Sequence, residues 1–357
     1  IDFFENEGIE HIHLTTAHAV SIPGSVDAWT RVLSEYGTMN LDRVFAAAIG
    51  YAEDGYVVAP RIHKDWVDHL DKLLLTESAT EKLLIDGRPP KPGEIMKNPW
   101  LADTLRAIAE QGRDGFYSGP VAEDIVSYLN SLGGVHTTDD FAAQDSEFLT
   151  PIFSTYRDHA VHTVPPSNSG LSTLMILNIL EGYDMAEFGQ NSATSLHLIT
   201  EAMRRAFADR AMYLGDTNFN PNMPLKELTS KKYAEKLRQS ISMDAASESD
   251  SANFNKEHLK YESKETTHIS VVDKDGNAVS LTYTLEQSYG SKYIVEGAGF
   301  LLNNEMGDFN PIPGYTNSQG LIGTDPNLIA PEKRMLSSMT PTIVAEDGKP
   351  VFAVGSP

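Results

Sequence analysis

A polar run that ends abruptly at a strongly patterned β-hairpin is the feature that most constrains this chain. Residues 243–265 are acidic, rich in serine and poor in apolar side chains. Such a segment cannot bury enough apolar surface to offset the entropy of ordering it, so we expect a mobile linker. Val, Ile, Thr and Tyr then dominate residues 269–272 and 278–285, on either side of the sequence DKDGN at 273–277. Because Asp-Gly favours the backbone of a tight turn, this pattern predicts a hairpin.

Thr266 stands between the run and the hairpin, where a break in the chain would give it a free α-amine. A threonine hydroxyl is a weak nucleophile unless a base lies beside it, and an N-terminal amine can be that base. Its ordinary pKa of roughly 7.7–8.0 leaves part of the amine neutral near pH 7, where a general base is efficient. A self-cleaving precursor needs this arrangement. On the hairpin alone, however, an ordinary threonine at the start of a strand is the better interpretation.

Sequence beyond the hairpin favours the first interpretation. Residues 266–311 read TTHISVVDKDGNAVSLTYTLEQSYGSKYIVEGAGFLLNNEMGDFNP, followed by KRMLSSMTPTIV at 333–344 and GSP at 355–357. These motifs resemble the γ-glutamyltransferase (glutathione hydrolase) family of N-terminal-nucleophile hydrolases. The large-subunit half of that family is similar to four earlier segments: VSIPGSVDAW (20–29), RDGFYSGPVAEDIV (113–126), PPSNSGLS (165–172) and HLITEAMRRAFADRAMYLGD (197–216).

The resemblance implies an α+β fold, the four-layer αββα sandwich of the N-terminal-nucleophile hydrolases. It makes residues 1–242 a helix-rich part of the large subunit, 243–265 a processing linker and 266–357 the start of the small subunit, together one structural domain. It also implies that the chain is truncated at both ends. In the family, glycines that follow the GSP sequence form an oxyanion hole with their backbone amides.

Hydrophobic periodicity independently predicts four helices. They cover residues 40–53, 100–111, 119–132 and 195–214. Asn40 is a candidate cap of the first, and Gly133-Gly134 is a typical stop for the third. On the longest helix, Arg204, Arg205 and Arg210 are expected to form structural ion pairs.

Strands and loops are predicted around these helices. Residues 152–163 are strand-like and end before Pro165-Pro166, whereas residues 90–99 are predicted to form a loop. A second hairpin is expected from residues 341–345 and 351–354. Buried hairpins between helical layers fit the implied sandwich.

The resemblance also implies catalytic residues. Thr266 matches the family nucleophile, which places chain cleavage between Glu265 and Thr266. Thr267 is its rival, and a mapped cleavage point would separate the two. Thr284 matches a threonine whose hydroxyl lies near the nucleophile and assists processing; the alternative is an ordinary inward-facing strand residue.

Five residues match substrate-binding positions. Asp308 matches the carboxylate that pairs with the substrate α-ammonium through a charge-assisted hydrogen bond, and Glu305 falls near the same ammonium. Ser337 and Ser338 match the serine pair that binds the substrate carboxylate, although adjacent loop hydroxyls are also ordinary capping groups. Glu286 replaces the usual Asn, and a carboxylate cannot donate the hydrogen bonds of an amide.

Two further positions bear on the substrate. In the family an Arg clamps the α-carboxylate. One alignment puts Phe4 at that position, which favours an acylase or another amidase, and the other places the Arg upstream of Ile1. Residues 311–320 are a candidate lid in which Tyr315 closes over the substrate; a plain surface loop is the alternative.

Composition limits the partners. With 28 basic and 50 acidic residues the net charge is −22, which disfavours nucleic acid because phosphate binding needs clustered Lys and Arg. Cysteine is absent, which excludes disulfides and thiolate chemistry within these residues. No apolar run reaches the ~18–20 residues of a membrane span, and no signal peptide is visible. The implied mechanism uses no cofactor and no metal.

The resemblance therefore implies a precursor that cleaves itself into a large and a small subunit. Thr266 would then attack the γ-amide of a glutathione-like donor, and water or an amine or peptide acceptor would release the γ-glutamyl ester. Two alternatives stay open: an acylase or small-amide hydrolase of the same fold, acting on cephalosporin, glutaryl or oxamate amides, and an unprocessed, inactive relative that binds amino acids. The family suggests a periplasmic or extracellular protein, with the cytoplasm not excluded.

Overall fold

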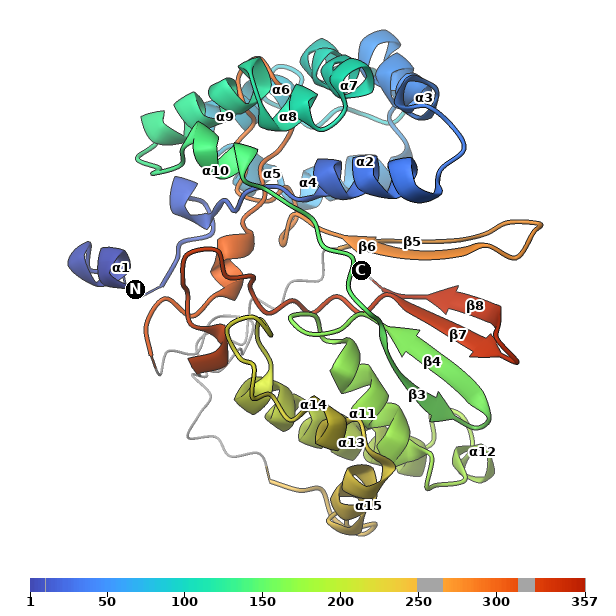
Figure 1. Cartoon of the computed structure of the whole chain (residues 1–357). Helices are drawn as coiled ribbons and strands as arrows, with labels where there is room; N and C mark the ends of the chain where they lie inside the picture. Colours follow the sequence, from blue (N-terminus) through green and yellow to red (C-terminus); the bar gives the residue numbers. More distant parts are fainter. Residues whose placement is uncertain (10, 249–265, 314–324, 357) are drawn as a thin grey trace. The chain divides into compact units, whose positions relative to one another are not determined.

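The computed structural model describes residues 1–9, 11–248, 266–313 and 325–356. They form helices and antiparallel strands whose contacts divide the chain into two compact units (Figure 1). The first unit comprises Ile1–His11, Leu149–Thr284 and Gly307–Pro357, and the second comprises Ile12–Phe148 and Leu285–Met306. The predicted division at residues 242 and 265 concerns the processed chain, and it stays a prediction.

An antiparallel sheet in the order β3-β4-β7-β8 organises the first unit (Figure 1). Its strands are β3 (Ile152–Tyr156), β4 (His159–Thr163), β7 (Thr342–Glu346) and β8 (Lys349–Val354). Thr163 pairs with Thr342, so segments far apart in the sequence share one sheet. The predicted second hairpin is confirmed as β7 and β8, and it turns at Asp347 and Gly348, both with positive φ.

The strand-like stretch 152–163 is a hairpin and not a single strand. Arg157 and Asp158 turn the chain with φ angles of 47° and 68°. The pattern gave no turn signal because neither residue is Gly or Pro, although Asp tolerates the left-handed region better than most residues. Ile152 and Thr163 are therefore direct neighbours across the ladder.

Helix α11 (Gly170–Leu180) is the buried centre of the first unit. Leu174 packs with Val161 and Val344 of the sheet, while Leu171 and Met175 pack with Ala206 of α13 (Ala193–Tyr213). A helix that is apolar all round is expected to be covered on all sides. The remaining helices of this unit are α1 (Asp2–Asn6), α12 (Met185–Phe188), α14 (Leu225–Leu228) and α15 (Lys231–Gln239).

The predicted helix over residues 195–214 is confirmed as α13, but four of its larger apolar residues do not face the core. Leu196, Met203, Phe207 and Met212 are exposed. Apart from Leu198, the buried face consists of small, polar or charged residues: Ser195, Glu201, Ala202, Ala206 and Arg210. Small side chains allow α13 to lie close to α11, and that close approach leaves the bulkier stripe outside.

The first predicted hairpin is confirmed as β5 (Thr267–Val272) and β6 (Ala278–Tyr283). Asp273 closes its turn by accepting hydrogen bonds from the backbone amides of Asp275 and Asn277, each at 2.9 Å. Ser280 of β6 joins the hairpin to the sheet. Its hydroxyl donates to the carbonyl of Val354 at 3.0 Å and accepts from the amide of Thr342 at 3.1 Å.

The second unit is mainly helical. Its core gathers Phe45, Tyr117, Ile125, Leu129 and Phe141 with residues of the 285–306 segment. Its elements are α2 (Ser25–Tyr36), α3 (Leu41–Asp54), β1 (Tyr56–Val57), α4 (Pro60–Asp68), α5 (Leu70–Leu73), α6 (Glu77–Leu83), β2 (Ile95–Met96), α7 (Pro99–Gln111), α8 (Asp114–Tyr117), α9 (Pro120–Ser131) and α10 (Thr138–Ala142).

The predicted helices of this unit are confirmed as α3, α7 and α9. Asn40 occupies the position before α3, yet its side chain makes no capping hydrogen bond. Gly133 ends α9 as predicted, with a φ of 84°, and the amide of Gly134 donates to the carbonyl of Leu129 at 2.9 Å.

Within the described ranges, none of the helices has both the length and the apolar character needed to cross a bilayer.

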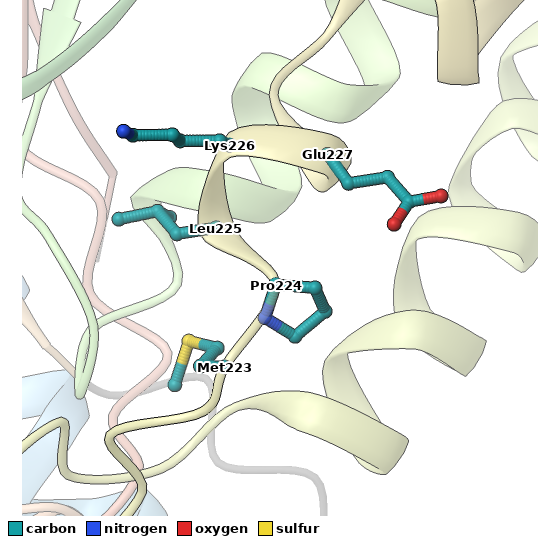
Figure 2. A pocket seen from close by; sticks show the side chains of 5 residues that line it. All are labelled: Met223, Pro224, Leu225, Lys226 and Glu227. Carbon is teal, nitrogen blue, oxygen red and sulfur yellow. The ribbon is translucent and has the colours of Figure 1, made fainter.

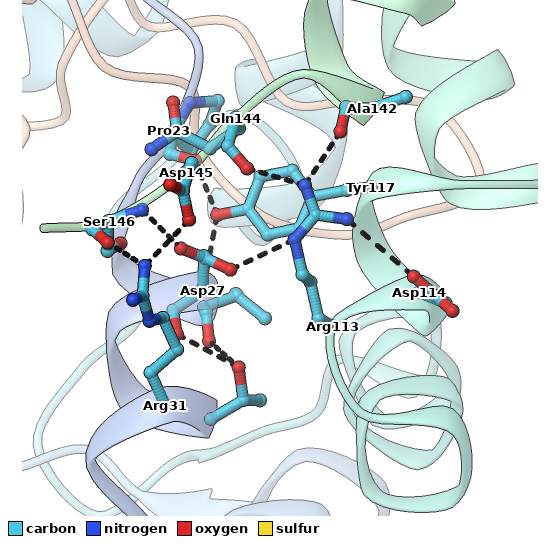
Figure 3. Close-up of polar contacts among 12 residues, drawn as sticks. Pro23, Asp27, Arg31, Arg113, Asp114, Tyr117, Ala142, Gln144, Asp145 and Ser146 are labelled. Atoms are coloured by element: carbon cyan, nitrogen blue, oxygen red, sulfur yellow. Dashed lines mark hydrogen bonds and ion pairs between the residues drawn. The ribbon is translucent and has the colours of Figure 1, made fainter.

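An ion pair between a buried aspartate of α2 and the arginine before α8 also binds the segment after α10 (Figure 3). Asp27 is 1% exposed, and its carboxylate accepts from Arg113 Nε at 2.9 Å and from the amide of Ser146 at 2.6 Å. Arg113 also donates to the carbonyls of Ala142 and Gln144. Tyr117 donates its hydroxyl hydrogen to a carbonyl of the neighbouring loop, and burial raises its pKa to about 12. Each charge of this pair thus has direct partners.

Candidate active site

Thr266 lies immediately before strand β5, with its hydroxyl beside that of Thr284. The two Oγ1 atoms are 3.4 Å apart, and both residues are half-buried. Thr267 is exposed and pairs with Tyr283 in the ladder. Because side chains alternate along a strand, Thr267 and Thr266 point to opposite faces. The position beside Thr284 thus belongs to Thr266, whereas Glu265, the other side of the expected cleavage site, lies outside the described residues.

The same face of the hairpin continues with polar side chains. His268 contacts Thr282 Oγ1 through Nδ1 at 2.7 Å and Ser270 Oγ through Nε2 at 2.9 Å. Gly355 lies against this imidazole, since a Cβ at that position would fall 2.2 Å from two of its ring atoms. Sequence reasoning did not single out His268 or Thr282, although their alternation with Thr266 and Thr284 was a usable signal.

The serine pair Ser337 and Ser338 is held by the segment that precedes α11. The amide of Ser337 donates to the carbonyl of Ser167 at 2.9 Å, and Ser169 Oγ donates to the carbonyl of Ser337 at 2.6 Å. Ser169 occupies the N-cap position of α11, but its hydroxyl makes no capping bond and donates to the Ser337 carbonyl instead. Gly170 allows the start of α11 to lie close to the chain that leaves β4, because a Cβ there would lie 2.4 Å from the carbonyl oxygen of Val164.

Arg210 of α13 reaches this serine segment. It is 4% exposed, and its Nε donates to Ser169 Oγ at 2.7 Å while Nη2 donates to Ser338 Oγ at 3.4 Å. The expected ion pairs on the helix exist for Arg204 and Arg205, which both contact Glu201. For Arg210 the expectation of an ion pair along the helix is wrong. Burial lowers the pKa of Arg210 to about 10, so its guanidinium stays charged near neutral pH.

Asp308 is a buried carboxylate in the same unit. It is 9% exposed, and its backbone carbonyl accepts from Asn327 Nδ2 at 2.7 Å. Burial raises the pKa of Asp308 to about 7, while the charge of Arg210 acts in the opposite direction. A carboxylate with this pKa gains charge-assisted bonding when a cationic ligand arrives.

Glu286 and Glu305 belong to the second unit. Glu286 is 5% exposed and has a φ of 76°, in the left-handed region. The structure adds a residue that sequence reasoning missed, Lys292, which is 1% exposed and donates to the carbonyl of Gly290. Burial lowers the pKa of Lys292 to about 8, and the charge of Glu286 opposes this shift. The amide of Glu305 donates to Asn303 Oδ1 at 3.1 Å.

The two remaining candidates add little to the site. Phe4 is a buried residue of α1 and meets Phe3 edge to face, with ring centroids 5.3 Å apart. Tyr315, the candidate lid residue, lies outside the described residues.

No group of three or more His, Asp or Glu within the described part of the chain is placed to hold a metal ion.

A hollow of about 490 Å³ lies at α14, lined by Met223, Pro224, Leu225, Lys226 and Glu227 (Figure 2). It includes none of the predicted site residues, so it does not mark the candidate active site.

Comparison with known proteins identifies the family. The family model for γ-glutamyltranspeptidase matches residues 1–357. The chain belongs to the γ-glutamyltranspeptidase family. It is 40% identical over 346 residues to the glutathione hydrolase proenzyme of Escherichia coli (strain K12), covering 96% of this chain and 59% of that protein. It is also 35% identical over 342 residues to the acylase ACY 1 proenzyme of Pseudomonas sp. (strain SE83), covering 96% and 58%.

Solved structures agree on the fold. The cephalosporin acylase from Bacillus halodurans is similar with a TM-score of 0.83 and 27% identity, covering 99% of this chain and 62% of that one. The γ-glutamyltranspeptidase of Helicobacter pylori is similar with a TM-score of 0.62 and 30% identity, covering 65% and 66%. The predicted α+β fold of the N-terminal-nucleophile hydrolases is thereby confirmed. The chain spans about three fifths of the length of the curated relatives it matches.

Proposed function

We propose that the whole protein is a self-processing γ-glutamyl transferase and hydrolase with Thr266 as its nucleophile. The observation that carries this proposal is the pair of threonine hydroxyls, Thr266 Oγ1 and Thr284 Oγ1, 3.4 Å apart at the start of strand β5. The names of the proenzyme relatives support the precursor step.

Processing needs no group beyond the chain and water. The Thr266 hydroxyl oxygen attacks the carbonyl carbon of residue 265, the peptide C–N bond breaks, and the nitrogen of Thr266 takes the hydroxyl proton and leaves as a free amine. Water then hydrolyses the resulting ester, which restores the hydroxyl. The hydroxyl of Thr284 is placed to hydrogen-bond with the attacking oxygen.

Turnover uses the newly formed amine. The Thr266 amine accepts the hydroxyl proton while the oxygen attacks the γ-carbonyl carbon of a glutathione-like donor. The γ-amide bond breaks, the leaving amine takes a proton, and a γ-glutamyl ester remains on Thr266. Water or the amine of an acceptor amino acid or peptide then releases it. Asp308 would bind the donor ammonium, and Ser337 and Ser338 would bind the carboxylate. The family resemblance also assigns Glu305 and Glu286 to substrate binding.

A matched pair of variants of the full-length protein tests this mechanism. We expect Thr266→Ala to stay one chain without turnover of γ-glutamyl-p-nitroanilide, and Thr267→Ala to be cleaved with Thr266 as the new N-terminus. Intact-mass spectrometry and N-terminal sequencing read out both variants. Wild-type protein that stays uncleaved yet binds amino acids would favour the inactive relative. Full turnover by Thr266→Ala would end the proposal.

An acylase is the second candidate, and the acylase relatives support it. The carboxylate of Glu286 cannot make the amide contacts that Asn makes in well-studied members. Comparing kcat/KM for γ-glutamyl-p-nitroanilide and glutaryl-p-nitroanilide separates the two. A preference for the glutaryl donor, which lacks the ammonium, would establish the acylase.

Location stays a proposal of the same kind. The family suggests a periplasmic or extracellular site of action. Fractionation of cells that express the full-length protein, followed by immunodetection, would test it, and recovery in the cytoplasmic fraction alone would contradict it.

A further inference from the structure

The two serines assigned to carboxylate binding both accept a hydrogen bond from within the protein. Ser338 Oγ accepts from Arg210 Nη2 at 3.4 Å, and Ser337 Oγ accepts from the amide of Met339 at 3.2 Å. A hydroxyl has one hydrogen to donate, and that hydrogen points away from a donor that already faces the oxygen. Both hydroxyls are thus oriented as donors, which suits a carboxylate, a group that only accepts.

Arg210 also fixes the backbone that carries this pair. Its Nε donates to Ser169 Oγ at 2.7 Å, and Ser169 in turn donates its only hydroxyl hydrogen to the carbonyl of Ser337 at 2.6 Å. The direction of each bond in this relay is set by the guanidinium, which can only donate. One buried side chain of α13 therefore acts on both serines: it orients the hydroxyl of Ser338 directly and reaches the backbone of Ser337 through Ser169.

We propose that Arg210 is a positioning residue for donor recognition, which orders Ser337 and Ser338 through its hydrogen bonds. This inference rests on the proposed function. The property that it assigns to Arg210 is the planar geometry of the guanidinium, which reaches Ser169 and Ser338 together.

Arg210→Lys in the full-length, processed enzyme tests this role. Lysine keeps the positive charge but cannot reproduce the planar fork that reaches two hydroxyls. We expect kcat/KM to fall about tenfold for γ-glutamyl- and glutaryl-p-nitroanilide, which both carry the carboxylate. For 4-aminobutyryl-p-nitroanilide, which keeps the ammonium and lacks the carboxylate, we expect little change.

Arg204→Lys is the matched control, because Arg204 lies on the same helix and pairs with Glu201, not with the serines. All three donors should be turned over by this variant as by the wild type. Ser169→Ala is a second test that does not depend on Arg210 variants folding. It removes the relay to Ser337 and costs no helix cap, so it should reproduce the selective loss on the carboxylate-bearing donors.

The outcomes distinguish this inference from the proposed function. Equal losses on all three donors, or wild-type kinetics in both Arg210→Lys and Ser169→Ala, would overturn the positioning role while the proposed function stands. A processed wild-type enzyme that releases p-nitroaniline from none of the donors would overturn both.

Discussion

Two buried aspartates, one in each compact unit, are placed differently with respect to an arginine. Asp27 and Arg113 are in direct contact at 2.9 Å, and backbone amides and carbonyls complete the bonding of both (Figure 3). Arg210 and Asp308 interact through charge, and the hydrogen bonds of Arg210 described above go to neutral hydroxyls. In the first pair, each charge is hydrogen-bonded by groups of the protein itself. In the second, Arg210 orients hydroxyls that we propose bind a ligand.

Burial of charge alone therefore does not identify a functional site. Burial of an ion pair is costly, and the protein recovers the cost only when each charge is fully hydrogen-bonded. Where that condition is met, as at Asp27, the pair is structural. A buried carboxylate whose pKa is raised to about 7, as at Asp308, is a better functional candidate.

The largest expected effect is on stability, from Arg113→Ala. Removing Arg113 leaves the Asp27 carboxylate buried without its cation, so we expect a loss of about 3 kcal/mol in the free energy of unfolding. Chemical denaturation measures it. Arg106→Ala is the control, because its ion pairs with Glu53 and Asp103 are at the surface and such pairs contribute under about 1 kcal/mol. Equal losses in the two variants would show that the ion pair of the buried Asp27 contributes no more to stability than a surface pair.

Asp308→Asn should act on recognition of the donor. Without a carboxylate for the ammonium, we expect kcat/KM for γ-glutamyl-p-nitroanilide to fall about 100-fold. The glutaryl donor has no ammonium and should be turned over nearly as by the wild type. If both donors lost activity equally, Asp308 would belong with Asp27 as a structural residue.

Glu201→Gln tests a third buried carboxylate, which lies on α13 together with Arg210. Arg205 and Ser247 hydrogen-bond to the Glu201 carboxylate, and although burial opposes them, its pKa is lowered to about 2. A depressed carboxyl pKa stabilises the fold above the ordinary pKa near 4.5, and this stabilisation is lost as the pH falls from there toward 2. We expect Glu201→Gln to cost about 2 kcal/mol at pH 7 and much less at pH 3. A cost that did not change with pH would contradict the ionised cluster.

The smallest effect is a pH dependence of binding. Because burial raises the pKa of Asp308 to about 7, the carboxylate ionises as the pH rises through neutrality. We therefore expect the KM for γ-glutamyl-p-nitroanilide to fall by up to about tenfold between pH 6 and pH 8. The glutaryl donor serves as the reference that corrects for titration of the Thr266 amine. Parallel KM profiles for the two donors would separate Asp308 from ammonium binding.

Local chemistry made much of this protein predictable. Asp-Gly turns and alternating β-branched residues predicted both hairpins, and apolar periodicity predicted α3, α7, α9 and α13. The motifs around Thr266, Asp308 and Ser337-Ser338 predicted the family. The turn at Arg157-Asp158 was missed because its positive φ angles occur without glycine.

Neighbours that are distant in sequence decided the rest. The sequence of α13 sets the spacing of its side chains, but packing against α11 determines which face is buried, and with it whether Arg210 meets solvent or serines. Likewise Ser169 is a cap residue by position, and it serves the Ser337 segment because the chain returns there 168 residues later. Local sequence determines conformation over one or two turns, whereas the partner of a buried polar group is determined only when the whole core is assembled.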